Sequence, residues 1–349
     1  MAKNKLSFFN RILFLINTLF AVGLLFSLLL PKLAPEQFGF LSLISLVVPI
    51  FIILNVFFVL YWIFSGFKKQ LLQSFLVLLL SYFFMPQLYK FSDADQDKEV
   101  SSLSIMSYNV RKFNMYKWIK TDSIEVSIKN FIKKENPDIL VLQEYRNLKN
   151  FVLDYPYYIN PLLDNYSEPV ENNKHKTDLA IYSKYPIINN GLIKYSKFLA
   201  SSMFVDIVKN KDTLRVYNFH LASLGVIPDE DYFGYKDSKN LLKGIRHSFK
   251  IQQQQIDTLN AHMKTSKYKI ILAGDLNNTA YSWAYKNIKN NLQDSFLKAG
   301  KGFGKTYKFK IFPLRIDYIF VDKNIQINTH KNYQEKYSDH YPLKATIVF

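Results

Sequence analysis

Nine polar residues stand at or beside the ends of short apolar stretches in the C-terminal part of the chain. They are Asn109, Glu144, Asn218, His220, Asp275, Asn277, Asp317, Asp339 and His340. Carboxylates and amides suit a hard cation such as Mg²⁺ or Mn²⁺, which takes oxygen ligands and keeps several waters. Histidines and a further aspartate can transfer protons and offset the charge of a phosphate. The set therefore favours metal-assisted chemistry on a phosphate group.

Other interpretations of these residues are weaker once the residues are taken together. Asn and Asp are ordinary turn residues, and a lone histidine such as His220 more often serves the fold than catalysis. Zinc fits less well than magnesium, because neither His220 nor His340 has a histidine four residues away and the chain has no cysteine. Turn chemistry alone does not explain why all of these side chains collect at strand ends, so we interpret them as one site.

The elements that must position this site are short β-rich runs separated by helical or turn-rich segments. The runs cover residues 103–110, 138–144, 179–184, 203–208, 214–221, 269–275, 316–322 and 343–349. Helical periodicity is present at 123–134 and 248–263. Eight strands are too many for one small sheet, and many are apolar on one side only. The pattern predicts an α/β domain in which two sheets pack face to face with helices outside.

Six motifs in this region resemble those of a known superfamily. In chain order they are MSYNV, ILVLQE, VYNFHLAS, ILAGDLNNT, RIDYIF and YSDHYPL. They resemble the endonuclease/exonuclease/phosphatase superfamily of DNase I-like, metal-dependent phosphoesterases, from about residue 103 to the end of the chain. The segments GIRHSFKIQQQQ and GFGKTY resemble its membrane-anchored bacterial branch. The resemblance implies a four-layer α/β/β/α sandwich with its site at one edge of the paired sheets.

The resemblance also implies roles for the metal-binding positions. Glu144 would be the main ligand of Mg²⁺ or Mn²⁺, with Asn109 in the first shell or close to it. Asp339 would contact a second metal or act through a water. A divalent cation at these positions would lower the barrier by neutralising charge on the phosphoryl oxygens.

Four residues would carry the proton transfers of the implied reaction. His340 would act on the attacking water or on the phosphate, held in one tautomer by Asp317. Asp275 would position or deprotonate the water. His220 resembles a second histidine of the nuclease and sphingomyelinase branches, where it is a general acid or phosphate ligand. Which histidine is the acid and which the base stays open at this point.

Three further residues are predicted to bind substrate phosphate. By the resemblance, Asn277 and Asn218 would donate hydrogen bonds to phosphate oxygens, and Asn277 would also take part in catalysis. Arg246, at the end of an insert that covers residues 221–246, is placed to hold a second phosphate, as a pyrophosphate would require.

The N-terminal part has a different composition, with three uncharged apolar runs at about 12–30, 38–64 and 71–88. A membrane-spanning helix needs roughly 20 such residues, so the first two runs are long enough and the third is short. We predict a membrane anchor of three transmembrane helices over residues 1–92, followed by a catalytic domain over 100–349. The alternatives are a cleaved signal peptide for the first run and a buried helical hairpin.

Positive charge predicts the orientation of this anchor. Lys3, Lys5 and Arg11 precede the first run, and Lys68 and Lys69 lie between the second and third. By the positive-inside rule the N-terminus is cytoplasmic, and three crossings place the catalytic domain on the periplasmic side of a bacterial inner membrane. If the third run does not span, the domain is cytoplasmic.

The net charge bears on the partners of the protein. The chain carries +17, and residues 1–99 hold eight Lys/Arg and five Asp/Glu, which leaves about +14 on the rest. This balance favours a lipid bilayer and an anionic phosphate-containing substrate as partners, and it permits nucleic acid. Compositional drift toward Lys and Asn would explain the charge equally well.

Three functions follow as hypotheses. The first is a membrane-anchored phosphoesterase acting on a lipid-linked phosphate or pyrophosphate, or on a phospholipid headgroup. The second is an extracytoplasmic DNA or RNA nuclease. The third is a subunit of a membrane assembly with little turnover.

Overall fold

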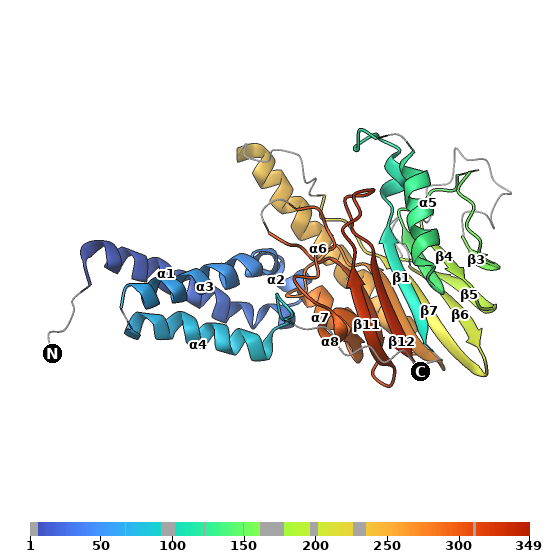
Figure 1. Cartoon of the computed structure of the whole chain (residues 1–349). Coiled ribbons are helices and arrows are strands. Elements are labelled where there is room, and N and C mark those ends of the chain that lie inside the picture. Colours follow the sequence, from blue (N-terminus) through green and yellow to red (C-terminus); the bar gives the residue numbers. More distant parts are fainter. Residues whose placement is uncertain are drawn as a thin grey trace.

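The protein combines an N-terminal helical bundle with two stacked β-sheets that carry helices on their outer faces (Figure 1). The computed structural model describes residues 6–66, 68–91, 102–121, 123–148, 150–160, 178–195, 202–225, 235–309 and 312–349. In Figure 1 the bundle projects from one side of the sheets, next to helices α6 and α7. The bundle and the pair of sheets are thus two structurally different parts of the chain.

Three helices form the bundle: α1 (Phe8–Ser27), α3 (Val48–Phe64) and α4 (Lys68–Phe84). Between α1 and α3 the chain makes helix α2 (Pro35–Ser42) and two 3₁₀ turns, Leu30–Lys32 and Leu43–Leu46. Pro35 and Pro49 sit in the first turns of α2 and α3, where a missing N–H costs nothing. Pro49 therefore accounts for the start of a new helix within the second apolar run.

The interior of the bundle contains a network of polar side chains next to buried apolar residues such as Leu24 and Val48. The Nδ2 of Asn17 donates to Ser74 Oγ at 2.6 Å, Ser74 donates to Asn55 Oδ1 at 2.8 Å, and Trp62 Nε1 donates to Asn17 Oδ1 at 2.7 Å. These four side chains are fully buried and join α1, α3 and α4. Other apolar side chains point outward, and Phe57 is 61 % exposed. This distribution reverses that of a bundle folded in water.

The prediction of three transmembrane helices is supported only in part. The segment Phe8–Lys32 is long and apolar enough to cross a membrane, although a signal sequence has the same features. Pro35–Leu46 and Val48–Phe64 meet at a bend of 44° and qualify only as a pair. Helix α4 has 17 residues and is shorter than a typical span. By length and composition, the described residues thus contain one candidate span, or two if the bent pair is one.

The first sheet has six strands in the order β11-β12-β1-β2-β4-β3. Their bounds are Gln326–Asn332 (β11), Leu343–Val348 (β12), Leu103–Asn109 (β1), Ile139–Gln143 (β2), Ala180–Ser183 (β4) and Tyr157–Ile159 (β3). Strands β1 and β2 are parallel and their neighbours pair antiparallel. The sheet thus joins the two ends of the catalytic region, because β1 pairs with β12.

The second sheet has six strands in the order β5-β6-β7-β8-β10-β9. Their bounds are Ile187–Ile193 (β5), Ser202–Lys209 (β6), Asp212–His220 (β7), Lys269–Asp275 (β8), Asp317–Asp322 (β10) and Leu292–Asp294 (β9). Only β7 and β8 pair in parallel. The eight predicted strands are all present, and the prediction of an α/β fold with two sheets is confirmed. Sequence reasoning missed β3, β5, β9 and β11.

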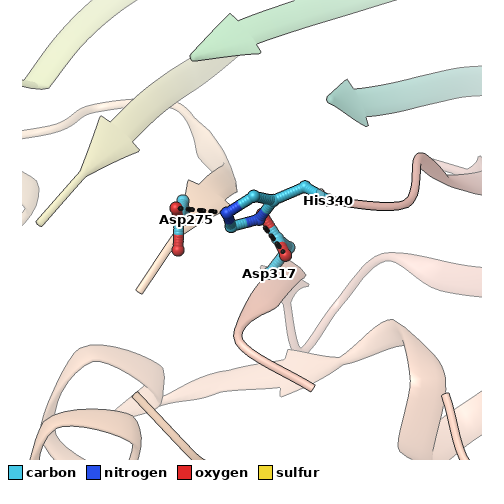
Figure 2. A group of neighbouring side chains, drawn as sticks. All are labelled: Asp275, Asp317 and His340. Atoms are coloured by element: carbon cyan, nitrogen blue, oxygen red, sulfur yellow. Dashed lines mark hydrogen bonds and ion pairs between the residues drawn. The ribbon is translucent and has the colours of Figure 1, made fainter. Parts of the chain in front are cut away.

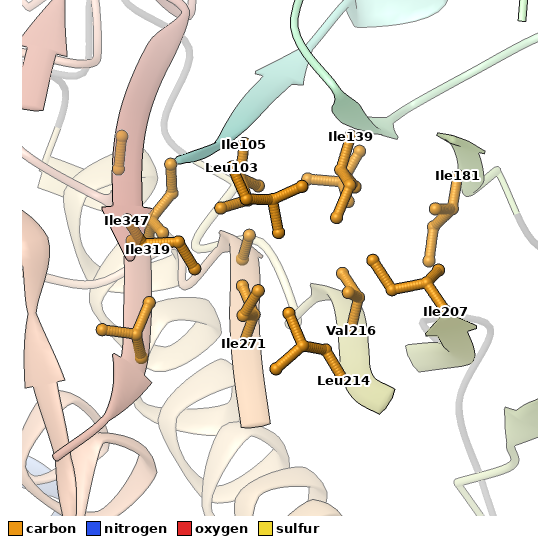
Figure 3. Packing of buried hydrophobic residues seen from close by; sticks show 14 of the residues in the cluster. Leu103, Ile105, Ile139, Ile181, Ile207, Leu214, Val216, Ile271, Ile319 and Ile347 are labelled. Carbon is orange, nitrogen blue, oxygen red and sulfur yellow. The ribbon is translucent and has the colours of Figure 1, made fainter. Parts of the chain in front are cut away.

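Apolar side chains fill the space between the sheets (Figure 3). Ile105 and Ile139 from the first sheet meet Val216, Ile271 and Ile319 from the second, and all five are fully buried. Burying such a side chain contributes about 1.5–3 kcal/mol relative to leaving it in water. This layer holds the two sheets face to face.

Helices cover both outer faces. Helix α5 (Ile124–Glu135) packs Ile128 and Phe131 against the first sheet, and α6 (Tyr235–Met263) packs Ile256 and Leu259 against the second. Two shorter helices, α7 (Trp283–Lys289) and α8 (Ser295–Ala299), follow β8 and β9. Helix α6 begins 13 residues before the predicted start at 248, so the second half of the insert at 221–246 is helical.

A glycine fixes the closest approach of two strands at the site edge. Gly274 in β8 has φ +154°, and a Cβ there would lie 1.9 Å from the carbonyl oxygen of Phe219 in β7. No side chain fits in that space, which explains a glycine directly before Asp275. By contrast, a Cβ at Gly244 in α6 would meet nothing within 4 Å.

We therefore predict opposite effects for two glycine-to-alanine changes. Gly274→Ala should lower the free energy of unfolding by about 1–3 kcal/mol or more, because β7 and β8 must separate. Gly244→Ala should raise it by about 0.5–1 kcal/mol, since alanine favours a helix interior. Urea unfolding of the full chain in detergent measures both, and equal stabilities of the two variants would contradict the prediction.

Candidate active site

The inner faces of the strands change from apolar to polar toward one edge of the sheets. The inward positions are Leu103, Ile105, Ser107 and Asn109 in β1, Ile139, Val141 and Gln143 in β2, Leu214, Val216, Asn218 and His220 in β7, and Ile271, Ala273 and Asp275 in β8. Alternate residues of a strand point the same way, so one face carries the core at one end and polar groups at the other. The predicted residues meet for this reason.

His340 lies between two buried aspartates (Figure 2). Its Nδ1 is 3.0 Å from Oδ2 of Asp317, and its Nε2 is 3.7 Å from Oδ2 of Asp275. Asp275 ends β8, Asp317 begins β10 and His340 precedes β12, so three elements of both sheets contribute. The ring nitrogens already face the two carboxylates. We therefore interpret this group as an oriented histidine and not as the ligands of one metal ion.

The charges of this group shift its protonation in opposite senses. Burial alone would lower the pKa of His340, but the carboxylates of Asp317 and Asp275 raise it well above its usual value. Burial, together with the charge of Asp317, raises the pKa of Asp275 to about 6. The neighbouring carboxylates thus favour the protonated form of His340, and burial favours the protonated form of Asp275.

Asn109 connects the two sheets but does not present its oxygen to a metal. Its Nδ2 lies 3.1 Å from Oε1 of Glu144 and 3.1 Å from Oδ2 of Asp275. Its Oδ1 accepts a hydrogen bond from the backbone N–H of Arg111 at 3.0 Å. The predicted role of Asn109 as a metal ligand is not supported by this geometry, because the amide nitrogen faces the carboxylates.

Glu144 and Asp339 supply carboxylates to the cavity that His340 also lines. Glu144 follows β2 in the left-handed region with φ +48°, a conformation that costs free energy and is often found at functional sites. Asp339 Oδ2 pairs with Arg111 Nη1 at 3.0 Å. Glu144 is half-buried and Asp339 is buried, and carboxylate oxygens are the ligands that a divalent cation such as Mg²⁺ takes. Glu144 and Asp339 are the residues that would hold it.

His220 approaches the same carboxylate oxygen of Asp275 as His340 does. Its Nε2 is 3.7 Å from Asp275 Oδ2, and its Nδ1 is 3.8 Å from Oδ1 of Asp178. Burial lowers the pKa of His220, but Asp178 and then Asp275 outweigh it and raise the pKa to about 9. Sequence reasoning missed Asp178, which stands two residues before β4. An acid immediately ahead of a predicted strand was the available signal.

Asn277 is placed at the cavity by the tight turn after β8. Its φ is +52°, its backbone N–H donates to Asp275 Oδ1 at 2.8 Å, and its Nδ2 donates to the carbonyl of Leu221 at 3.0 Å. Asparagine tolerates the left-handed conformation better than most residues. The structure thus brings Asn277 to the site together with Asp275.

Two residues predicted to bind phosphate lie elsewhere. Asn218 is fully buried, where its Nδ2 donates to the carbonyls of Leu142 and Ala180 and its Oδ1 accepts from Gln143. This amide is committed to joining the sheets. Arg246 is exposed on α6, and its Nε lies 3.7 Å from the position of a Cβ at Gly39 in α2. Neither residue lines the cavity of the site, so both phosphate-binding roles stay predictions. A position at a strand end or in a nearby loop does not fix the direction of a side chain.

Arg111 and Trp118 were not predicted and line the same cavity. The guanidinium of Arg111 stacks 3.8 Å from the centre of the Trp118 ring while it pairs with Asp339. The four consecutive residues from Arg111 to Asn114 all have positive φ, so the chain turns sharply after β1. The motif MSYNV ends at Val110, directly before Arg111. This position next to a motif was the only feature of the sequence that indicated a role for Arg111.

The site opens into a cavity of about 420 Å³. Glu144, Asn277, Asp339 and His340 are among the polar residues of its lining. Its remaining wall is largely apolar and includes side chains from both the catalytic region and the segment between α2 and α3. This volume holds a drug-sized molecule, so the site can bind considerably more than a phosphate.

Two histidines and a cluster of carboxylates at the edge of paired sheets are typical of a hydrolytic class of α/β protein. Residues 106–340 match the Endonuclease/Exonuclease/phosphatase family, and the chain belongs to that family. Residues 10–88 match a second family, a domain of unknown function (DUF8431). The family assignment confirms the superfamily predicted from the six motifs.

Solved structures agree with this assignment at the level of the fold. A humanized TDP2 of D. rerio, carrying 14 mutations, is 17% identical with a TM-score of 0.52, over 71% of this chain and 100% of that chain. A functionally unknown conserved protein of Enterococcus faecalis V583 is 17% identical with a TM-score of 0.50, over 70% and 99%. No curated protein matches the chain.

The geometry of His340 leads to a prediction about its variants. His340→Ala should lower the rate of phosphoester hydrolysis by ~10²-fold or more, because a charged donor beside the reacting phosphate is removed. Asp317→Asn should cause a similar loss, since the ring is then no longer held by a carboxylate. His247→Ala, an exposed histidine on α6, is the matched control and should keep full activity. The catalytic role of His340 would be refuted if His340→Ala kept both the unfolding curve and the hydrolysis rate of the wild type.

Proposed function

We propose that this protein is a membrane-anchored, Mg²⁺- or Mn²⁺-dependent phosphoesterase that hydrolyses a phosphate ester or anhydride of a lipid-linked substrate. Membership of the family supports hydrolysis of phosphoester bonds. The observation that carries the proposal most directly is His340, buried between Asp317 and Asp275 and lining one cavity with Glu144 and Asp339.

In this proposal each charged side chain has one task. The imidazolium of His340, held at Nδ1 by Asp317, donates a hydrogen bond to a phosphoryl oxygen as negative charge builds there. Asp275 accepts the proton of the attacking water through its carboxylate, for which a pKa of about 6 is well placed. A divalent cation held by Glu144 and Asp339 supplies further positive charge at the phosphoryl oxygens when it is bound.

His220 completes the reaction on the leaving-group side. Water adds to phosphorus, the bond from phosphorus to the leaving oxygen breaks, and that oxygen needs a proton. With a pKa of about 9, His220 carries this proton at neutral pH, and Asp178 holds the ring in place. In this proposal Asp275 is the base, His220 is the acid, and His340 stabilises the phosphoryl oxygens.

The bundle supports the membrane part of the proposal. Its polar network lies inside and its apolar side chains outside, which suits helices packed in a bilayer, where polar side chains bond across helices. Phe83, Phe84 and Phe91 are exposed near the catalytic region, and aromatic residues favour membrane interfaces. We infer that α1, α3 and α4 embed together and that the catalytic domain lies on the periplasmic side of a bacterial inner membrane.

The metal and substrate are tested on the purified full chain in detergent. Long-chain phosphate esters and pyrophosphates should be hydrolysed in Mg²⁺, and EDTA should lower the rate at least ~10²-fold because the phosphoryl charge is no longer offset. Added Mg²⁺ should restore it. Plasmid DNA is the competing substrate, and cleavage of DNA without cleavage of the lipid phosphates would replace the proposal by the nuclease hypothesis.

The proposed orientation has an independent test. A reporter that is active only outside the cytoplasm, fused after Phe349, should be active, and a reporter that fluoresces only in the cytoplasm should be dark. The reason is that three crossings from a cytoplasmic N-terminus end outside. The reverse pattern would place the catalytic domain in the cytoplasm and would remove the third span from the proposal.

A further inference from the structure

The catalytic cavity is closed on one side by the N-terminal part of the chain. Leu46 and Val47 from the break between α2 and α3, and Ile50 from the first turn of α3, line the same cavity as Glu144 and His340. These residues are outside the region that matches the Endonuclease/Exonuclease/phosphatase family. The cavity is therefore composite, with a polar end from the catalytic region and an apolar wall from the bundle.

Hydrogen bonds fix this wall against the site. The hydroxyl of Thr279, two residues after Asn277, donates to the carbonyl of Ser45 at 2.9 Å in a buried position. The backbone N–H of Glu36 donates to Gln253 Oε1 at 3.0 Å, and Gln254 Nε2 donates to Glu36 Oε1 at 3.0 Å. The contact between bundle and catalytic region is thus specific, and the position of Val47 follows from it.

The catalytic region also contributes apolar side chains to the lining of the cavity. Phe309, Phe312, Leu314 and Ile316 face the cavity from the segment before β10. A phosphate group gains nothing from such surfaces, because burying charge against apolar groups costs free energy. A hydrocarbon chain gains about 0.8 kcal/mol for each methylene removed from water. The two ends of the cavity thus suit the two ends of one amphiphile.

Helix α3 continues this apolar surface toward the outside of the bundle. Ile50, Phe57 and Phe64 are spaced by seven residues and so lie on one face of the helix. Phe57 is 61 % exposed and Phe64 is 86 % exposed. One helix face thus runs from the cavity wall onto the outward apolar surface of the bundle.

We propose that the segment Leu46–Ile50 determines substrate specificity by holding the hydrocarbon chain of an amphiphilic phosphate, whose phosphate lies at Glu144 and His340. The chain enters from the bilayer along the face of α3. This inference rests on the proposed function for the position of the phosphate, and it adds the residues that select a lipid over a water-soluble phosphoester.

The test compares two valine-to-tryptophan variants of the full chain, kept in an amphipathic polymer without added lipid. Val47→Trp fills the cavity, while Val56→Trp places the same side chain on α3 about 120° away from the Ile50 face. Val47 and Val56 are 36 % and 42 % exposed, so both sites tolerate a large residue. The probes are octylphosphonate and methylphosphonate, which are not hydrolysed, and calorimetry measures their binding.

Wild type and Val56→Trp should bind octylphosphonate at least about tenfold more tightly than methylphosphonate, the effect of burying about two methylene groups. Val47→Trp should bind both probes with the affinity that wild type has for methylphosphonate. The inference is overturned if wild type binds the two phosphonates with equal affinity, or if both variants lose the same affinity for octylphosphonate. Hydrolysis of bis-p-nitrophenyl phosphate in Mg²⁺ separates the two proposals. If the protein hydrolyses this ester but binds octylphosphonate no more tightly than methylphosphonate, only this inference fails. If it prefers octylphosphonate but hydrolyses nothing, only the proposed function fails.

Discussion

The hydrogen bond from Asn109 to Asp275 crosses from one sheet to the other at the edge where the site lies. A second crossing, from Gln143 to Asn218, lies deeper and is fully buried. An unpaired amide or carboxylate in such a place costs free energy, so these bonds permit essentially one relative position of the two sheets. The apolar layer brings the sheets together, but these two hydrogen bonds, from Asn109 to Asp275 and from Gln143 to Asn218, set their relative position. The catalytic geometry depends on it, because Asp275 belongs to one sheet and Glu144 follows a strand of the other.

The position of Asp275 between the sheets also explains the electrostatics of the site. Asp275 is buried, bonded to Asn109 on one side and faced by His220 and His340 on others. Burial and Asp317 raise its pKa, while both histidines oppose that rise. Asp178 and Asp317 in turn keep the two histidines charged. Each histidine therefore stands between two carboxylates, and the arrangement holds positive charge where a phosphate would bind.

The bundle is more than an attachment to this site. Ser45, Leu46, Val47 and Ile50 contact or line the catalytic region, so the chain that would hold the protein in a membrane also shapes the cavity. A soluble phosphoesterase of the same fold would leave that side open to water. Under the proposed function, this arrangement would let an amphiphile move from the bilayer to the site without full exposure to water.

The sequence by itself determined the α/β class, eight of the strands, the family and most of the residues at the site edge. It could do so because strand periodicity and the position of polar residues at strand ends are local properties. Alternate residues from Leu103 to Asn109 point inward, and this pattern can also be predicted from the sequence.

Only the tertiary structure decided which polar residues face the cavity. Asn218 does not line the cavity because its amide satisfies carbonyls of the other sheet, and Asp178 and Arg111 were missed because their partners are far away in sequence. The apolar wall at Val47 was equally invisible, since nothing near residue 47 indicates that it meets His340. Contacts between distant segments depend on how the sheets and the bundle pack, and packing is a property of the whole chain.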